Sequence, residues 1–249
     1  MSSSELSNNA NQRSTTPLDV LRQFARQRDP RSPTELCELC SAEIAPSHRH
    51  LLELANRAIV CVCQPCSILF SDPVAGGGKY RLVPSRYLFL QDFQMTDEQW
   101  DDLQIPVNMA YIFHSTQTNH TMAFYPSPAG AMESTLSLQG WDELASTNLI
   151  LHDLEPDVEA LLINHVQNRS GNGDYREHYI VPIDACYELV GLIRLKWKGL
   201  SGGEEVWKAI ATFFANLRKR AITIEGNATA SQPAALPFWR GGAYAGPEL

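Results

Sequence analysis

Five of the six cysteines of this sequence lie close together near its N-terminal end. They include two C-x-x-C pairs, Cys37/Cys40 and Cys63/Cys66, with Cys61 just before the second pair. A C-x-x-C turn brings two thiolates to one ion, and two such turns complete a tetrahedral four-thiolate site. The sequence therefore predicts a metal ion bound by Cys37, Cys40, Cys63 and Cys66.

Three further potential ligands leave the composition of this site open. Cys61 could replace one of the four cysteines or lie beside them, and His48 or His50 could supply an imidazole in a mixed Cys/His site. Four thiolates suit zinc and iron equally. We expect a zinc ion that folds a segment too small to hold a core of its own. The alternatives are a rubredoxin-like iron with an electron-transfer role, an iron–sulfur cluster, and transient metal handling.

The charge, the apolar runs and the cysteines of the chain indicate which partners and which cellular compartment to expect. The chain has 20 Lys and Arg against 28 Asp and Glu, a net charge of −8, and no basic block, which disfavours nucleic-acid binding. No apolar run approaches the roughly 20 residues of a membrane span. The N-terminal stretch also lacks the apolar region of a secretory signal. We therefore expect a cytoplasmic protein, in which reducing conditions favour metal ligation over disulfides.

Composition and hydrophobic pattern divide the chain into five segments. These are a polar, disordered segment at 1–17, a short helix with a linker at 18–34, a cysteine-rich metal-binding module at 35–72, an α+β domain at 80–225, and an Ala/Pro/Gly-rich disordered tail at 226–249. The predicted fold class is α+β. A small zinc-ribbon, rubredoxin-like or treble-clef-like module precedes a mixed α/β domain, and the two termini are disordered.

Hydrophobic periodicity predicts the elements of both parts. Residues 50–58 form a helix or an extended turn, and residues 157–166 form either a strand or a helix. Thr96 and Gln99 have the spacing of a capping box, and Asp184 could cap a later helix. The remaining strands are predicted at 59–63, 80–84, 87–90, 107–114, 122–125, 133–138 and 179–182, and the helices at 97–103, 141–146, 184–197 and 204–222.

The larger domain shows no recognisable catalytic set. Cys186 on a predicted helix is typical of a small core residue, although His178 keeps a Cys/His pair open. Ser127 has no G-x-S-x-G pattern around it. A metal-dependent treble-clef nuclease of the HNH type would use His50 as its base, but the apolar residues 68–70 offer no second ligand set. We therefore favour a non-enzymatic protein, with this nuclease and a Cys186-dependent activity as alternatives.

Several separated blocks of the sequence resemble one bacterial family. They include C-E-L-C, H-R-H-L-L-E-L, C-V-C-Q-P-C-S-I-L-F, I-P-V-N-M-A-Y-I-F, A-F-Y-P-S-P-A-G-A-M-E-S, Y-I-V-P-I-D-A-C-Y-E-L-V-G-L-I-R and W-K-G-L-S-G-G. The resemblance covers about residues 36–218. The family is uncharacterised, and its genes tend to lie in clusters that encode NiFe hydrogenases. The resemblance implies an accessory role in assembly, maturation or function of such a hydrogenase, with a hydrogenase subunit or maturation factor as protein partner.

Overall fold

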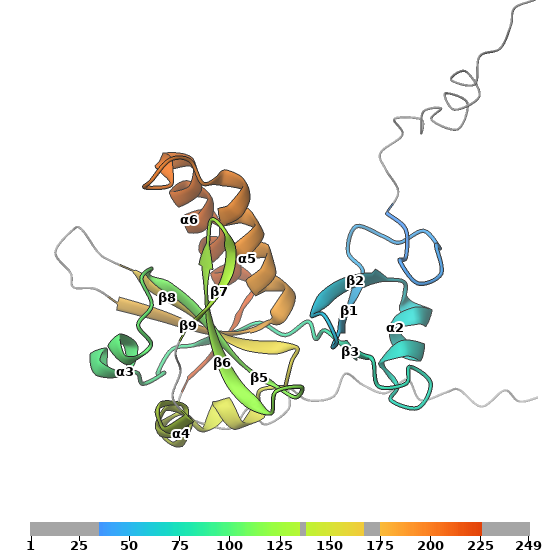
Figure 1. The fold of residues 1–249 in the computed structure, drawn as a ribbon, viewed down its shortest axis with the longest axis horizontal. Coiled ribbons are helices and arrows are strands. Elements are labelled where there is room, and N and C mark those ends of the chain that lie inside the picture. Colours follow the sequence, from blue (N-terminus) through green and yellow to red (C-terminus); the bar gives the residue numbers. More distant parts are fainter. Residues whose placement is uncertain (1–34, 135–137, 167–174, 226–249) are drawn as a thin grey trace, which may run out of the picture.

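Two β-sheets organise the chain, one of seven strands and one of three (Figure 1). The computed structural model describes residues 35–134, 138–166 and 175–225. The predicted helix within 18–34 and the segments predicted to be disordered, 1–17 and 226–249, lie outside these residues. Within the described ranges, no helix is long and apolar enough to cross a membrane.

The seven-stranded sheet has the order β10-β4-β9-β8-β5-β6-β7. Neighbouring strands are antiparallel, except that β10 runs parallel to β4. The bounds are Leu88–Leu90 for β4, Met109–Ser115 for β5, His120–Ser127 for β6, Gly130–Ser134 for β7, Glu159–Val166 for β8, Tyr175–Pro182 for β9 and Ile222–Ile224 for β10.

Helices cover both faces of this sheet (Figure 1). On one face lie α5 (Ile183–Lys196) and α6 (Gly203–Arg220), and on the other α3 (Asp97–Asp102), α4 (Leu138–Thr147) and the short 3₁₀ helix η1 (Leu149–Asp153). Ala160 and Leu162 of β8 pack toward α5 and α6, whereas Leu161 and Ile163 pack toward the opposite face. A strand buried on both faces carries a continuous apolar run, which explains why its sequence fitted a strand and a helix equally well.

The cysteine-bearing part consists of the three-stranded sheet and one helix. Its antiparallel strands β1 (Arg49–Glu53), β2 (Ala58–Val62) and β3 (Tyr80–Leu82) have the order β2-β1-β3, and α2 (Gln64–Ser71) follows β2 at once. The helical alternative for 50–58 is wrong, because Leu51 and Leu52 are buried on opposite sides of β1. Helix α2 was missed, since eight residues with a proline in the first turn give little periodic signal.

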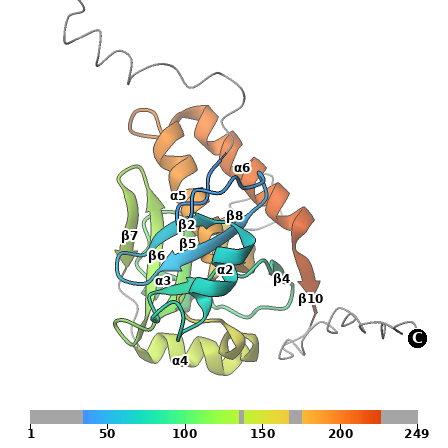
Figure 2. The ribbon, with the colours of Figure 1, turned by 90° about the vertical axis from the view of Figure 1, so that its right-hand side faces the viewer.

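The two parts are joined through one side of the β1–β2 hairpin, and Figure 2 shows β2 and α2 in front of the larger part. Leu52 is buried in the core beneath α5 and α6, and Ile59 packs against the same core. Two polar contacts reach α5: His50 Nδ1 lies 2.6 Å from Asp184 Oδ2, and Arg57 Nε donates to Tyr187 Oη over 3.3 Å. The arrangement of the hairpin is therefore fixed by both apolar and polar contacts with the larger part.

Of the two predicted helix caps, one is present in the structure and the other is not. Thr96 and Gln99 form the predicted capping box at the start of α3. Asp184 does not cap α5, because the N-cap position is Pro182 and no side chain caps this end. The Asp184 carboxylate lies instead beside His50. A residue that looks like a cap in the sequence thus connects the two parts of the molecule.

His178 in β9 predicts a specific pH dependence of stability. Its ring stacks on Phe93 with 4.4 Å between the centroids, and among the described residues its Nε2 atom has no hydrogen-bond partner. Burial, and after it the charge of Arg176, lowers the pKa of His178 to about 3. In the unfolded chain this imidazole titrates near its ordinary pKa of about 6.5. Between these two values only the unfolded state binds the proton, so the folded state loses stability as the pH falls below about 6.5.

The His178→Leu variant should lack the part of the pH-dependent destabilisation that His178 causes. We expect the free-energy difference between wild type and variant to change by up to about 1.4 kcal/mol for each pH unit below 6.5, in favour of the variant. Urea unfolding of both proteins at pH 7, 6 and 5 measures this difference. Any loss of metal at low pH affects both proteins equally. Parallel stability curves for the two proteins would contradict the prediction, because they would mean that His178 binds its proton over the same pH range in the folded and unfolded states.

Candidate metal centre

The four predicted cysteines converge in space. Cys37 and Cys40 lie on a turn before β1, Cys63 is the N-cap residue of α2, and Cys66 lies in the first turn of that helix. All four sulfur atoms lie within 4.8 Å of one another, and the Cys40 and Cys63 sulfurs are 3.6 Å apart. A tetrahedral ion with metal–sulfur bonds of about 2.3 Å would hold its sulfurs about 3.8 Å apart. This cysteine cluster could therefore hold a metal ion with little rearrangement.

Local backbone contacts hold the two cysteine pairs in place. The Glu38 amide donates to Cys61 O over 2.9 Å, and the Cys61 amide donates to Glu38 Oε1 over 2.7 Å, so the first turn is tied to β2. Cys63 has an extended backbone, and Pro65 starts α2 with the φ that a helix requires. The helix N-terminus places partial positive charge beside Cys63 and Cys66.

Among the four cysteines, Cys37 has a lowered thiol pKa and Cys66 a raised one. Burial opposes ionisation of Cys37, but backbone hydrogen bonds at Cys63, Cys40 and Leu39 outweigh it and lower the pKa of the Cys37 thiol to about 6. For Cys66, burial and then the hydrogen bonds from the other three cysteines raise the pKa of the thiol. Four thiolates this close cannot all ionise without a cation, and a metal ion would supply that charge while displacing the protons.

Cys61, His48 and His50 form a second group, separate from the four cysteines. Their ligand atoms also lie within 4.8 Å of one another. In the strand predicted at 59–63, Cys61 and Cys63 would project to the same side, because they are two positions apart. Their sulfurs nevertheless belong to different groups, because Cys63 lies beyond the end of β2 and turns with α2. The sequence did single out all three residues, but it did not show that they meet one another.

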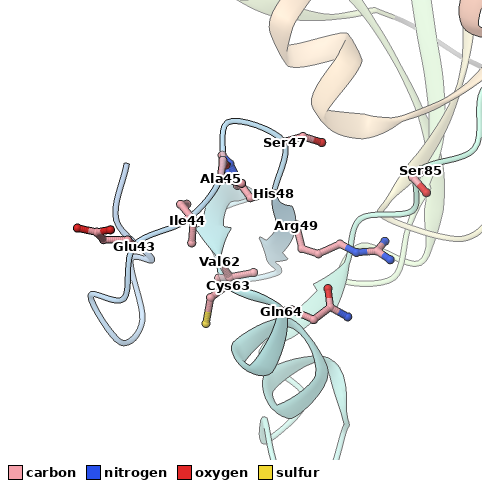
Figure 3. A pocket seen from close by; sticks show the side chains of 10 residues that line it. All are labelled: Glu43, Ile44, Ala45, Ser47, His48, Arg49, Val62, Cys63, Gln64 and Ser85. Carbon is pink, nitrogen blue, oxygen red and sulfur yellow. The ribbon is translucent and has the colours of Figure 1, made fainter. Parts of the chain in front are cut away.

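A pocket of about 410 Å³ lies beside the first group, between the loop that precedes β1 and the start of α2 (Figure 3). Cys63 and Gln64 line it from the α2 side, and Glu43, His48 and Arg49 line it from the loop side and the start of β1. In Figure 3 the Arg49 side chain extends toward Ser85. The N-terminal end of α2 is therefore accessible from solvent.

The other predicted catalytic residues do not form a site. Cys186 is fully buried, and burial raises the pKa of its thiol well above the ordinary value, so the thiol is neutral. Cys186 lies on α5 and is buried in the core between α5, α6 and the sheet, whereas His178 stacks on Phe93 on the opposite face of the sheet, so the Cys/His pair is not formed. Ser127 Oγ accepts the Ala129 amide, which is a turn contact. Past Cys66, the polar residues of helix α2 are Ser67 and Ser71, and their hydroxyls donate to the backbone oxygens of Gln64 and Ile68.

A comparison with known protein families identifies the family of this chain. A family model matches residues 36–221, which include both cysteine pairs, both histidines and nearly all of the seven-stranded sheet. The chain belongs to DUF5947, a family of unknown function. The prediction of an uncharacterised family over about 36–218 is thus confirmed, whereas the association with hydrogenases stays a prediction. The DUF5947 chain matches no curated protein and no solved structure. Its function must be inferred from the site itself.

Proposed function

We propose that this protein is a non-catalytic metal-binding accessory protein. The observation that carries the proposal is the convergence of Cys37, Cys40, Cys63 and Cys66 within 4.8 Å. Four sulfurs in this arrangement suit zinc, with iron as the alternative. We assign the four cysteines as ligands of one structural ion. No position is left open for a substrate when all four bind.

The surroundings of the cluster support a structural role for the ion. The buried core of this part consists of four aliphatic side chains and two of the cysteines themselves: Ile44, Leu51, Val60, Val62, Cys37 and Cys66. So small a core supplies little hydrophobic stabilisation, and metal binding then contributes directly to folding. The order of a cysteine turn, a β-hairpin and a helix that carries the second pair in its first turn favours a treble-clef-like module over a zinc ribbon.

We propose a protein as the partner of this module and its attached domain. The resemblance to a family encoded beside NiFe hydrogenases makes a hydrogenase subunit or maturation factor the first candidate. The acidic chain, with a net charge of −8, has no excess of cations for binding nucleic acid. The complete burial of Cys186 argues against the Cys186-dependent activity.

Anaerobic purification from the native host tests this proposal. We expect at least one equivalent of metal per chain and co-purification of a hydrogenase subunit or maturation factor. A colourless protein with zinc supports the structural ion, whereas visible charge-transfer bands would show iron and support the electron-transfer alternative. Metal-free protein would contradict the proposal. A partner that still co-purifies after all four cysteines are replaced by serine would show that the metal module does not make the contact.

A further inference from the structure

The His48–His50 pair has a geometry that calls for a cation. His48 Nδ1 lies 2.9 Å from Ala45 O, and His50 Nδ1 lies 2.6 Å from Asp184 Oδ2. Both partners are acceptors, so in each ring the proton resides on Nδ1 and the lone pair on Nε2. The two Nε2 atoms lie 3.2 Å apart. Two lone pairs that face each other repel, and only a shared proton or a metal ion makes this approach favourable.

We propose that His48, His50 and Cys61 bind a second divalent transition-metal ion, separate from the four-cysteine cluster, with zinc as the best-suited occupant. Two imidazole nitrogens and a thiolate are ligands of zinc and of similar borderline ions. With bonds of about 2.0–2.1 Å, two nitrogens on a tetrahedral ion lie about 3.3 Å apart. The separation of the two Nε2 atoms, 3.2 Å, is close to that value.

The β1–β2 hairpin explains why these three residues meet. His48 lies one residue before β1, and its Nε2 atom is 3.2 Å from that of His50 in the strand, so the two rings lie on the same side of the hairpin. Cys61 is the register partner of His50 across the antiparallel pair, so its side chain lies on that same side. Successive side chains of β1 point to opposite faces, so His50 points toward α5 and Leu51 lies in the small core beside the cysteine cluster. The two groups thus have separate sets of ligand atoms, although Cys61 also packs against the small core that contains Cys37 and Cys66.

Asp184 orients the site from the other part of the molecule. Its carboxylate holds the Nδ1–H of His50, which leaves Nε2 free to bind the ion, and this carboxylate–histidine arrangement is common behind metal ligands. Asp184 lies in the first turn of α5. It is therefore a positioning residue, and an ion at this site would link the hairpin to the seven-stranded sheet.

The charges around Cys61 also favour a cation. Burial, followed by the charges of Glu35 and Glu38, raises the pKa of the Cys61 thiol to about 11. The two carboxylates that oppose a bare thiolate also attract a divalent ion, which would compensate the charge of the thiolate. Glu35 Oε2 lies 3.7 Å from His48 Nδ1 and belongs to the same surroundings.

Three protein ligands leave a fourth position on a tetrahedral ion. Structural zinc sites are usually closed by four protein ligands, whereas sites that bind water or a substrate keep one position open. His48 and His50 also line a pocket of about 380 Å³, together with Asp184, Tyr87 and Ser85. A water molecule or a small anionic ligand can reach the ion through this pocket. The second site is therefore one with an exchangeable ligand.

Metal titration of the full chain tests this inference. Metal-free protein is titrated anaerobically with Co²⁺, and bound Zn²⁺ is counted after dialysis. We expect two equivalents for the wild type and one for His48→Gln and for Cys61→Ser, with the tetrathiolate cobalt spectrum retained in both variants. His120→Gln alters a partly exposed histidine that contacts the backbone oxygen of Thr118, far along the chain from the site, and should keep two equivalents. Asp184→Asn should weaken the second equivalent by about 10- to 100-fold and leave the first unchanged.

Two results would overturn the second site. The first is a wild-type chain that binds a single equivalent with a tetrathiolate spectrum, which would mean that a proton alone bridges His48 and His50. The second is a full two equivalents in His48→Gln and Cys61→Ser whose circular dichroism matches that of the wild type. The inference does not depend on the four-cysteine ion, because a chain that lacked the tetrathiolate spectrum could still bind one ion at His48, His50 and Cys61.

Discussion

Replacing Cys63 with serine is expected to abolish tight metal binding at the four-cysteine cluster and to unfold the part of the chain around it. Cys63 Sγ lies 3.6 Å from Cys40 Sγ, and Cys63 is also the N-cap residue of α2. A ligand present at a thousand times its dissociation constant adds about 4 kcal/mol to the stability of the folded state, and this contribution disappears with the site. Structural zinc in small modules binds with an apparent free energy of about 10–16 kcal/mol, so the loss can be larger.

Metal content and hydrogen exchange together measure this effect. We expect the tetrathiolate equivalent to disappear and the amides of β1 and β2 to lose protection, while the amides of β5, β8 and β9 keep theirs. The matched control is Cys61→Ser, which removes a sulfur from the same hairpin but should retain the tetrathiolate ion. Normal tetrathiolate content in Cys63→Ser, with loss in Cys61→Ser, would show that Cys61 is the fourth ligand.

The four-cysteine cluster was predictable because its signal is local. A C-x-x-C turn specifies the approach of its own two thiols, and Pro65 with the start of α2 shapes the second pair. The second group depends on information that spacing does not contain. Cys61 meets His50 only through the register of β1 with β2, and Asp184 reaches His50 from 134 positions further along the chain. The register of β1 with β2 is set within the hairpin by its turn, whereas the approach of Asp184 to His50 depends on how the two parts of the molecule pack together.

The fold shows the same division between local and distant causes. The capping box of α3 and the two strands that form the β5–β6 hairpin follow from neighbouring residues, and both the box and the strands were predicted. The order of the seven strands was not predicted, because β8 lies between β5 and β9, and β10, from the end of the described chain, pairs with β4 and becomes the edge strand. The buried run at 160–163 has no periodicity to distinguish a strand from a helix. Only the helices on both faces explain why it is apolar throughout.

A buried ion pair beside the connection between the two parts gives the second large expected effect. The guanidinium of Arg86 donates to both carboxylate oxygens of Glu159, over 2.6 Å each, and to Asp153 O over 2.8 Å. The Glu159 side chain is 1% exposed, and its Oε2 also accepts the Glu155 amide. Arg86 follows β3 closely in the chain, whereas Glu159 begins β8. The pair therefore anchors the connecting segment to the central sheet.

The Arg86→Met variant should be destabilised by about 3–5 kcal/mol, because it leaves the Glu159 carboxylate buried without its counter-charge. Urea unfolding at pH 7 measures this loss. Arg86→Lys should fall between wild type and Arg86→Met, since an ammonium keeps the charge but cannot form both bonds of the planar guanidinium. The double variant Arg86→Met/Glu159→Gln should recover much of the stability, because the neutral amide can still accept the Glu155 amide. A cost below about 1 kcal/mol for Arg86→Met would mean that solvent reaches Glu159 and that the pair behaves as a surface ion pair.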